Sequence, residues 1–311
     1  MISFRYHLVS LVAVLLALAL GLVLGATQLS GAVLDDLRAQ VKQGALQRQA
    51  LQGQARLLSG QLRDGDGVTA ALAPRIVAGM LKGVRVVLVG TPQADASVTD
   101  GVQKTLEQAG AKVTGRVRLT DDYADPRRAA DLRSFVTSGG QPAGFRLPES
   151  DEAGVLGGAL LSYVLVHGAG QAAGHAAEPA AVSQVLGGFG ALQMLRVESE
   201  QVAPADYAVV ISSAAVRGGA DPGRTLAQLV GALDHAGRGT VVAGTPAAAG
   251  PAGLVGLVRA DGTLATSVST VDDAQTAAGR VATVFALTQQ ATGQAGQYGS
   301  AGNADAPFPP V

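Results

Sequence analysis

Cysteine and tryptophan are absent from this chain of 311 residues, and only three methionines are present. Without cysteine the protein forms no disulfide bond and uses no thiolate chemistry, an absence that fits every compartment. Charge is also scarce, because Asp, Glu, Lys and Arg make up 15% of the residues and the formal net charge is −1. Such a weak field offers no attraction for a phosphate backbone, so we expect no nucleic-acid partner.

The longest uncharged segment lies near the start of the chain, where residues 8–26 are nineteen positions without a charge. A helix of this length is about 28 Å long and matches a hydrocarbon core of about 30 Å. A cleaved signal peptide is the alternative, but cleavage after Ala26 would place Leu24 where a small residue belongs. We therefore interpret the segment as an uncleaved, single-pass anchor. Arg5 before the helix favours a body on the extracytoplasmic side.

Small residues recur at every fourth position along this anchor and form one stripe that ends in Gly-x-x-x-Gly. Helices in lipid gain nothing from the hydrophobic effect, so close backbone approach through small side chains is a main route to association. We expect the anchor to pair with copies of itself, the alternative being that Ala and Gly are merely abundant. The stripe consists of Ala13, Ala17, Gly21 and Gly25.

The next segment carries a heptad seam, with positions at alternating steps of three and four residues. Gly44 and Arg48 are defects in its middle, and we expect Gly65 and Gly67 to end it. We interpret the seam as a self-associating, parallel coiled coil; a single helix folded back onto the body is the alternative. The seam residues are Leu34, Leu37, Val41, Gly44, Arg48, Leu51, Ala55, Leu58 and Leu62.

The rest of the chain alternates apolar runs with amphipathic segments, which is typical of an α/β body with a mostly parallel, Rossmann-like sheet. The first two runs, with a helix beginning near Ser97 between them, form a βαβ unit with a right-handed crossover. Further helices are expected from Asp125, Ser150, Asp221 and Thr270. The expected strands cover residues 83–90, 112–119, 207–212 and 240–243.

Two features close the body. Residues 254–258 and 264–270 predict two short strands joined by Ala260-Asp261-Gly262 as a hairpin. From Gly293 onward the composition is typical of a disordered tail. We therefore expect four parts: an anchor at 1–29, a coiled-coil stalk at 30–63, the α/β domain at 70–292 and the tail at 293–311.

Two strands of the body end in Gly-Thr-Pro, at residues 90–92 and 244–246. The carboxyl ends of parallel strands are where α/β folds place their ligands. However, neither turn carries the Gly-x-Gly-x-x-Gly of a dinucleotide site or the lysine of a phosphate loop. We interpret both as turns, with an active site at these ends as a distant alternative.

Other chemistry has little support in the residues. His167, His175 and Glu178 lie close in the sequence and could hold a metal, but their spacing has no specificity. His235 suits a helix end, where the dipole favours a cation. No arrangement of Ser, His and Asp or of paired His predicts catalysis. We therefore expect no enzyme, no catalytic residue and no bound cofactor, and we assign no metal ligand.

The opening residues, Met1 to Val14 with the sequence MISFRYHLVSLVAV, continue through Gly25 into the predicted coil and closely resemble the actinobacterial copper transporter B family, MctB. Residues 277–284 and the later Gly-Gln-Tyr-Gly at 296–299 are similar to the ending of that family. The resemblance implies a mycobacterial-type cell-envelope protein of copper transport, efflux or homeostasis. It also implies an outer-membrane channel, with copper as the transported ion.

The residues limit how such a channel could be built. Copper(I) selects Cys and Met ligands, and this chain has no Cys and no cluster of Met. A transmembrane barrel needs many segments of about ten residues with alternating polarity, whereas the body predicts α/β structure. One membrane helix cannot enclose a pore, so a channel requires a homo-oligomer. The alternative function is a membrane-anchored scaffold or interaction module without transport.

Overall fold

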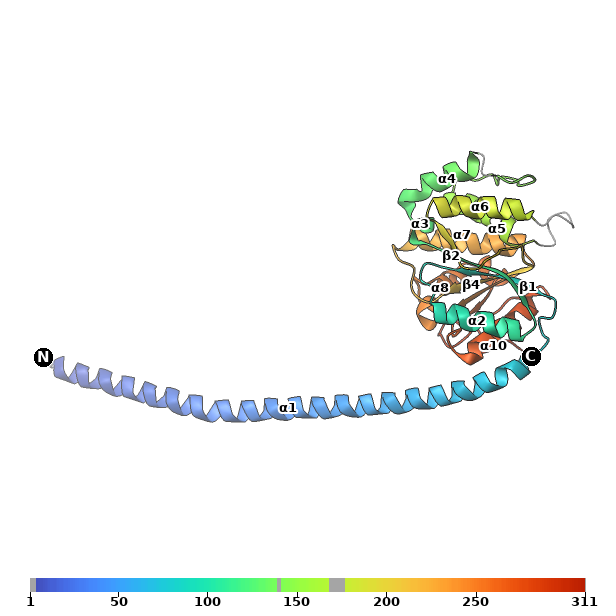
Figure 1. Cartoon of the computed structure of the whole chain (residues 1–311). Helices are drawn as coiled ribbons and strands as arrows, with labels where there is room; N and C mark the ends of the chain where they lie inside the picture. The colour runs from blue at the N-terminus through green and yellow to red at the C-terminus, as the bar shows by residue number, and fades with distance from the viewer. Residues whose placement is uncertain (1–3, 139–140, 168–176, 311) are drawn as a thin grey trace. The chain divides into compact units, whose positions relative to one another are not determined.

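The computed structural model describes residues 4–138, 141–167 and 177–310, and it divides into two compact units, residues 1–65 and 66–311. The first unit consists of the greater part of one long helix, α1 (Phe4–Ile76) (Figure 1). Within α1, Tyr6–Gly25 is long and apolar enough to cross a membrane, and in the described part of the chain it is the one segment that is. The division after Gly65 falls between the expected stalk and the expected α/β domain.

The helix α1 continues past the glycines that were expected to end it, so that expectation is wrong. Gly65 and Gly67 each cost about 1 kcal/mol relative to alanine in a helix and do not break α1. Within the second unit, the carboxylate of Asp66 accepts a hydrogen bond of 2.6 Å from the backbone N–H of Ala277. Ala277 begins α10 (Ala277–Gln290), whose first N–H groups have no partner inside their own helix. This tertiary contact helps to keep the last turns of α1 helical.

The second unit is built on a seven-stranded sheet with the order β3-β2-β1-β4-β5-β6-β7. The strand β3 is antiparallel to β2, and every other neighbouring pair is parallel. The expected α/β fold with a mostly parallel sheet is therefore confirmed. The strands are β1 (Arg85–Gly90), β2 (Lys112–Leu119), β3 (Leu195–Val197), β4 (Tyr207–Ser212), β5 (Thr240–Gly244), β6 (Ser269–Val271) and β7 (Gln297–Tyr298).

Helices cover both faces of this sheet, as Figure 1 shows. Val87 and Val89 of β1 pack on one side with α5, α6 and α7, while Val86 and Leu88 pack on the other with α2 and α10. Because both faces are buried, the strand is a continuous apolar run instead of an alternating one. These helices are α2 (Ala96–Gln108), α5 (Ala153–Leu165), α6 (Pro179–Ala191) and α7 (Ala220–Ala236).

The predicted hairpin after residue 253 is wrong, because α8 replaces its first strand and α9 replaces most of its second, of which only residues 269–270 belong to a strand, β6. Short apolar runs are ambiguous between strand and helix. Here Leu254, Val255 and Val258 lie on one face of a helix and are fully buried. The carboxylate of Asp261 accepts from the N–H groups of Thr263 and Leu264 at 2.9 and 3.0 Å, which starts a helical turn. The remaining helices are α3 (Asp121–Ala124), η1 (Pro126–Arg128), α4 (Ala129–Thr137), η2 (Pro246–Ala249), α8 (Leu254–Ala260) and α9 (Leu264–Ser267).

The segment expected to be a disordered tail differs from that expectation, because it adds strand β7 to the edge of the sheet. Tyr298 is 6% exposed and packs into the core face of α2 and α10. The reason is a specific anchoring site and not the composition of the segment. We call this site the Arg259–Asp272 cluster, and it consists of Arg259, Asp272, Tyr298, Ser300 and Ala301.

In the Arg259–Asp272 cluster, the guanidinium and carboxylate lie 2.8 Å apart with side chains 4% and 0% exposed. Arg259 also donates to the carbonyl of Tyr298 at 2.7 Å. The other carboxylate oxygen accepts from the N–H groups of Ser300 and Ala301 at 2.8 and 3.1 Å. Gly299 has a φ of +130°, and a Cβ there would lie 2.4 Å from the Asp272 carboxylate. Part of the Gly-Gln-Tyr-Gly segment therefore has a structural role.

Candidate functional site

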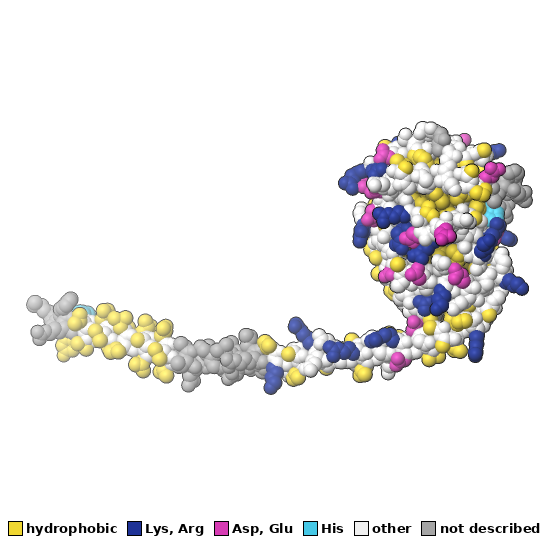
Figure 2. All heavy atoms as spheres, viewed as in Figure 1, with side chains coloured by type: hydrophobic (Ala, Val, Ile, Leu, Met, Phe, Trp, Pro, Cys, Tyr) yellow, Lys and Arg dark blue, Asp and Glu magenta, His cyan; other side chains and the backbone are white. Residues whose placement is uncertain are grey.

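The anchor presents its small-residue stripe without obstruction. A Cβ added at Gly21 or Gly25 would meet no atom within 4 Å, and the apolar window of Tyr6–Gly25 is 0% buried. Figure 2 shows hydrophobic side chains gathered along this part of α1. Since α1 is one helix here, Ala13 and Ala17 follow the same face. Small side chains along one face are the feature through which helices approach closely in lipid, and whether this helix does so stays a prediction.

The described part of the heptad seam is equally uncovered in the single chain. Val41, Leu51, Leu58 and Leu62 are 56–74% exposed. The predicted seam members Leu34 and Leu37 lie outside the residues whose side chains the structure describes. Four large apolar side chains in water along one helix are a liability for a monomer. Leu46 and Leu57, which lie outside the seam, are 58% and 72% exposed as well, so pairing through the seam stays a prediction.

In the body, the strand order creates a crevice where α/β folds bind ligands. Strands β1 and β4 are neighbours, and the chain moves outward from them in opposite directions, which makes a topological switch point. At the carboxyl ends of these strands lies a cavity of about 510 Å³. Its charged and polar lining side chains are Gln93, Asp121, Asp125, Arg127 and Arg217.

The charges around this switch-point cavity are paired with one another. Arg127 lies 2.7 Å from Asp125, and Arg217 lies 3.5 Å from Asp121. The hydrogen bonds from Arg127 hold the pKa of Asp125 below its usual range. Two acids balanced by two arginines give the rim no net charge. The cavity therefore suits a neutral polar molecule better than a phosphate or a metal ion.

The first Gly-Thr-Pro turn is also closed to phosphate by a carboxylate. Asp95 caps the N-terminus of α2 and accepts from the N–H of Ser97 at 2.8 Å. Hydrogen bonds from Ser97 lower the pKa of Asp95, so it carries its negative charge at neutral pH. A helix N-terminus binds phosphate through those same free N–H groups. The geometry agrees with the prediction that this turn is not a dinucleotide site.

Three buried hydroxyls beside the switch-point cavity have no hydrogen-bond partner among the described residues: those of Thr91, Ser212 and Tyr123. Thr91 and Ser212 directly extend the paired positions of β1 and β4, and by strand alternation both face the α5–α7 side, where Tyr123 is also buried. Burial raises the pKa of Tyr123. Thr245 of the second turn differs, since its hydroxyl donates to the carbonyl of Ser213 at 2.5 Å. No residue pattern in the sequence signals this difference.

We predict that Thr91→Val stabilises the protein by about 1 kcal/mol, because a buried hydroxyl without a partner costs about that much or more. Thermal unfolding of the full-length chain measures the change. Thr245→Val is the matched control, and we expect it to lose about 1 kcal/mol because it removes a hydrogen bond that is made. Loss of stability in Thr91→Val would show that its hydroxyl has a partner in solution.

His167, one of the three residues considered above as metal ligands and not assigned, lies in an ion-pair cluster with Arg85 and Asp206. The Nε2 atom of His167 accepts from Arg85 and lies 3.5 Å from Asp206, while its Nδ1 donates to the carbonyl of Ala205 at 2.8 Å. Burial opposes the charge of Asp206, but hydrogen bonds from Arg85 lower its pKa overall. His175 lies outside the described residues. These contacts hold the ring of His167 and both of its nitrogen atoms.

No group of three or more metal-binding side chains comes together among the residues that the structure describes. Met194 is fully buried on the α5–α7 side of the sheet, and Met80 packs on the α2–α10 side. Glu178 is exposed at the start of α6. The two described methionines therefore cannot share one copper(I) ion within the same body.

The sequence was compared with known proteins. It matches the family described as "Copper transport outer membrane protein, MctB" over residues 1–309. Proteins named "Copper transporter MctB" from Mycobacterium tuberculosis and Mycobacterium bovis are 34% identical over 304 residues, which covers 96% of this chain and 96% of each relative. The protein of that name from Mycobacterium leprae is 32% identical over 306 residues, with the same coverage.

Proposed function

This chain belongs to the MctB family of copper transport outer membrane proteins, and on that premise we propose that it moves copper across the cell envelope as a homo-oligomer. The observation that carries the proposal is the family match along nearly the whole chain, together with one membrane-spanning candidate, Tyr6–Gly25. One helix cannot enclose a path for an ion. A conducting form therefore needs several copies of the chain.

We propose that the copies meet through the stripe of Ala13, Ala17, Gly21 and Gly25 and through the Leu34–Leu62 seam, as a parallel coiled coil. Two features support this arrangement: the open space around Gly21 and Gly25, and the exposed leucines of α1. Because anchor and seam lie on one continuous helix, pairing in one favours the parallel pairing of the other. We also propose that the chain crosses the membrane once and that its body lies on the extracytoplasmic side, the side that Arg5 before the helix favours.

In this proposal copper is a transported ion and not a resident cofactor. The described residues supply no metal-binding group within one chain, and copper(I) prefers thiolate and thioether ligands. We propose that the ligands that contact the ion in transit come from contacts between subunits. The relatives are named as transporters and not as enzymes, which agrees with a protein that performs no catalysis.

The experiment that tests the assembly changes the stripe. We expect Gly21→Ile together with Gly25→Ile to convert the detergent-solubilised oligomer to a smaller species, because two branched side chains prevent close backbone approach. Analytical ultracentrifugation measures the size, and copper tolerance of cells that depend on this protein measures the function.

The matched control is Ala19→Ile with Val23→Ile, which adds bulk at the same spacing on the opposite face of the helix. It should leave oligomer size and copper tolerance unchanged. If the glycine variant keeps its size, the stripe has no part in assembly. If it dissociates while copper tolerance stays at the wild-type level, transport does not need the oligomer.

A second function is favoured by one observation, the absence of a metal-binding group among the described residues. On that basis we propose, as the alternative, a membrane-anchored scaffold whose body binds a protein partner. Copper titration and single-channel conductance on the same purified full-length oligomer separate the two functions. Conductance with copper binding supports transport, whereas a folded oligomer that shows neither supports the scaffold.

A further inference from the structure

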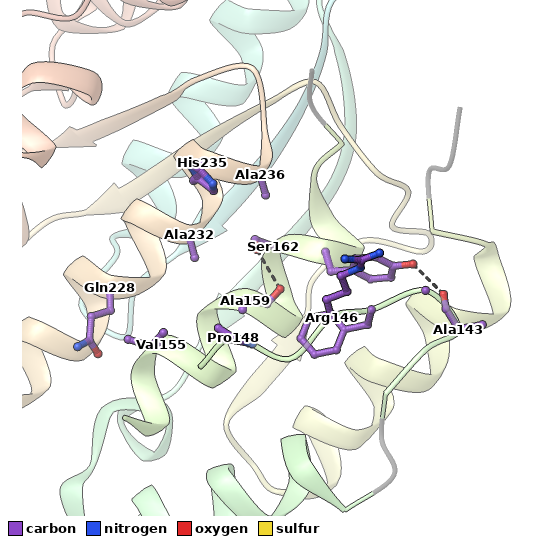
Figure 3. A pocket seen from close by; sticks show the side chains of 13 residues that line it. Ala143, Arg146, Pro148, Val155, Ala159, Ser162, Gln228, Ala232, His235 and Ala236 are labelled. Carbon is purple, nitrogen blue, oxygen red and sulfur yellow. Dashed lines mark hydrogen bonds between the residues drawn. The ribbon is translucent and has the colours of Figure 1, made fainter. Parts of the chain in front are cut away.

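A second cavity, of about 890 Å³, lies between α5, α7 and the segment 143–148, away from the switch point. Figure 3 shows Val155, Ala159 and Ser162 along α5, with Gln228 and Ala232 opposite them on α7. Its volume falls in the range of about 300–1,000 Å³ that is typical of small-molecule sites. Neither the copper function nor the proposed assembly uses this part of the fold.

The cavity exists because two helices pack closely with side chains that are too short to fill the space beside them. A Cβ at Gly158 would lie 3.2 Å from the Cα of Leu229, so α5 and α7 approach through glycine. Beside that contact the floor is formed by Ala159, Ala232 and Ala236. The result is an apolar trough along the helix pair.

Aromatic side chains hold the opposite wall in place. Phe145 and Tyr163 meet edge to face with ring centroids 5.5 Å apart, and the Tyr163 hydroxyl donates to the carbonyl of Ala143 at 2.8 Å. Ser162 uses its hydroxyl within its own helix, on the carbonyl of Ala159 at 3.0 Å. These polar atoms are already partnered, so the middle of the trough offers apolar surface to a ligand.

Arg146 is the one charged side chain that lines the cavity among the described residues. Arg146 and His235 line the cavity, and no lining residue among those described is acidic. Within the described part of the chain, neither of these two side chains makes a hydrogen bond or an ion pair. His235 lies in the last turn of α7. An apolar trough with an unpaired guanidinium is complementary to a molecule with an apolar chain and an anionic end.

We propose that this trough binds a long-chain fatty acid, with the acyl chain along Ala159, Ala232 and Ala236 and the carboxylate on Arg146. A guanidinium pairs with a carboxylate through two parallel hydrogen bonds, which fixes that end of the ligand. A single chain matches a single trough and a single unpaired arginine. The proposal is independent of copper transport.

The test uses palmitic acid that carries a photoreactive diazirine in its chain, added to the full-length protein in phosphatidylcholine nanodiscs. After irradiation, mass spectrometry maps the labelled peptides. We expect labelling within residues 143–163 and 228–236 that unlabelled palmitic acid competes away. Labelling confined to residues 6–25 would overturn the proposal, because it reports contact of the probe with the membrane segment alone.

Two variants examine the two ends of the ligand. Arg146→Gln should raise the probe concentration needed for half-maximal labelling roughly tenfold, because it removes a hydrogen-bonded charge that favours binding. Ala159→Trp should abolish labelling by filling the trough, with thermal unfolding as the check that it is folded. Arg133→Gln, which changes an exposed arginine of α4, is the matched control and should label as the wild type does. Equal labelling of Arg146→Gln and wild type would overturn the carboxylate assignment.

The form of the probe distinguishes the ligand source. Diazirine-palmitic acid methyl ester has the same chain without the anion, and we expect it to label the trough roughly tenfold more weakly. A phosphatidylglycerol with the same diazirine chain tests a membrane lipid as the occupant. If this phospholipid labels residues 143–163 and 228–236 better than the free acid, the fatty-acid proposal fails.

Discussion

We expect a chain that ends after Gly293 to have an unfolded or loosely packed α/β body, although the segment it loses is rich in glycine and proline. The truncation removes β7 and with it the carbonyl of Tyr298 and the N–H groups of Ser300 and Ala301. These groups complete the hydrogen bonding of a buried ion pair. Arg259 and Asp272 then keep each other, and Arg259 keeps the hydroxyl of Thr270, but both lose their partners in the C-terminal segment.

The size of the loss follows from the lost contacts. Each hydrogen bond to a charged group contributes about 1.5–3 kcal/mol, and the cluster loses at least three. Tyr298 and Gln297, 6% and 5% exposed, also leave the core. The total of at least about 5 kcal/mol is comparable with the whole stability of a domain, about 5–15 kcal/mol. Circular dichroism in the far and near ultraviolet, measured on the truncated protein, tests this outcome.

The control for this truncation ends after Pro307, which keeps the cluster and β7 and removes Phe308 from its edge contact with Phe285. We expect that chain to fold with a loss of about 1 kcal/mol, the value of an aromatic pair. A chain ending at Gly293 that is as stable as one ending at Pro307 would show that the Arg259–Asp272 cluster contributes little.

The sheet was predictable because its central strands are buried on both faces. Residues 112–119 and 207–212 were expected as strands and form β2 and β4 with those bounds. The expected strand at 83–90 begins at Arg85, and the one at 240–243 extends to Gly244. The runs of β1, β4 and β5 are almost continuously apolar and buried, which is a local signal that survives folding. The strand β2 differs, because Lys112, Arg116 and Arg118 interrupt its apolar residues.

The failures occurred where long-range contacts decide the local structure. Nothing near Gly299 announces that it must lie against Asp272, which is 27 positions earlier. Likewise, the helical continuation through Gly65 is held by the contact of Asp66 with Ala277. Composition predicted a tail and a helix end at these places because it reports intrinsic preference and not tertiary partners.

The candidate site was predictable only in part for the same reason. The Gly-Thr-Pro turns mark strand ends, but the switch point exists because β4 lies beside β1, an adjacency that the sequence does not specify. Thr91 and Thr245 have the same local sequence, Gly-Thr-Pro, yet the Thr91 hydroxyl has no hydrogen-bond partner among the described residues and the Thr245 hydroxyl has one. His167 is paired with Arg85, 82 positions away, which no local spacing reveals.

Arg259→Met is expected to lower the free energy of unfolding by about 3–5 kcal/mol, the usual cost of leaving one partner of a buried ion pair alone. Methionine replaces the aliphatic stem of arginine but none of its hydrogen bonds. Asp272, which is 0% exposed, then keeps only its bonds from the backbone and serine hydroxyl of the C-terminal segment. Thr270 and Tyr298 each lose a donor as well.

The matched control is Arg224→Met, because Arg224 and Asp221 form a pair that is 68% and 70% exposed at 3.5 Å. Exposed pairs contribute about 0–1 kcal/mol, so the control should change stability very little. Adding Asp272→Asn to Arg259→Met should recover part of the loss, since the amide oxygen still accepts from Ser300 and Ala301 without a buried charge. Equal losses from Arg259→Met and Arg224→Met would mean that water reaches the cluster, in which case the edge strand β7 is held by its backbone pairing with β6 and by packing.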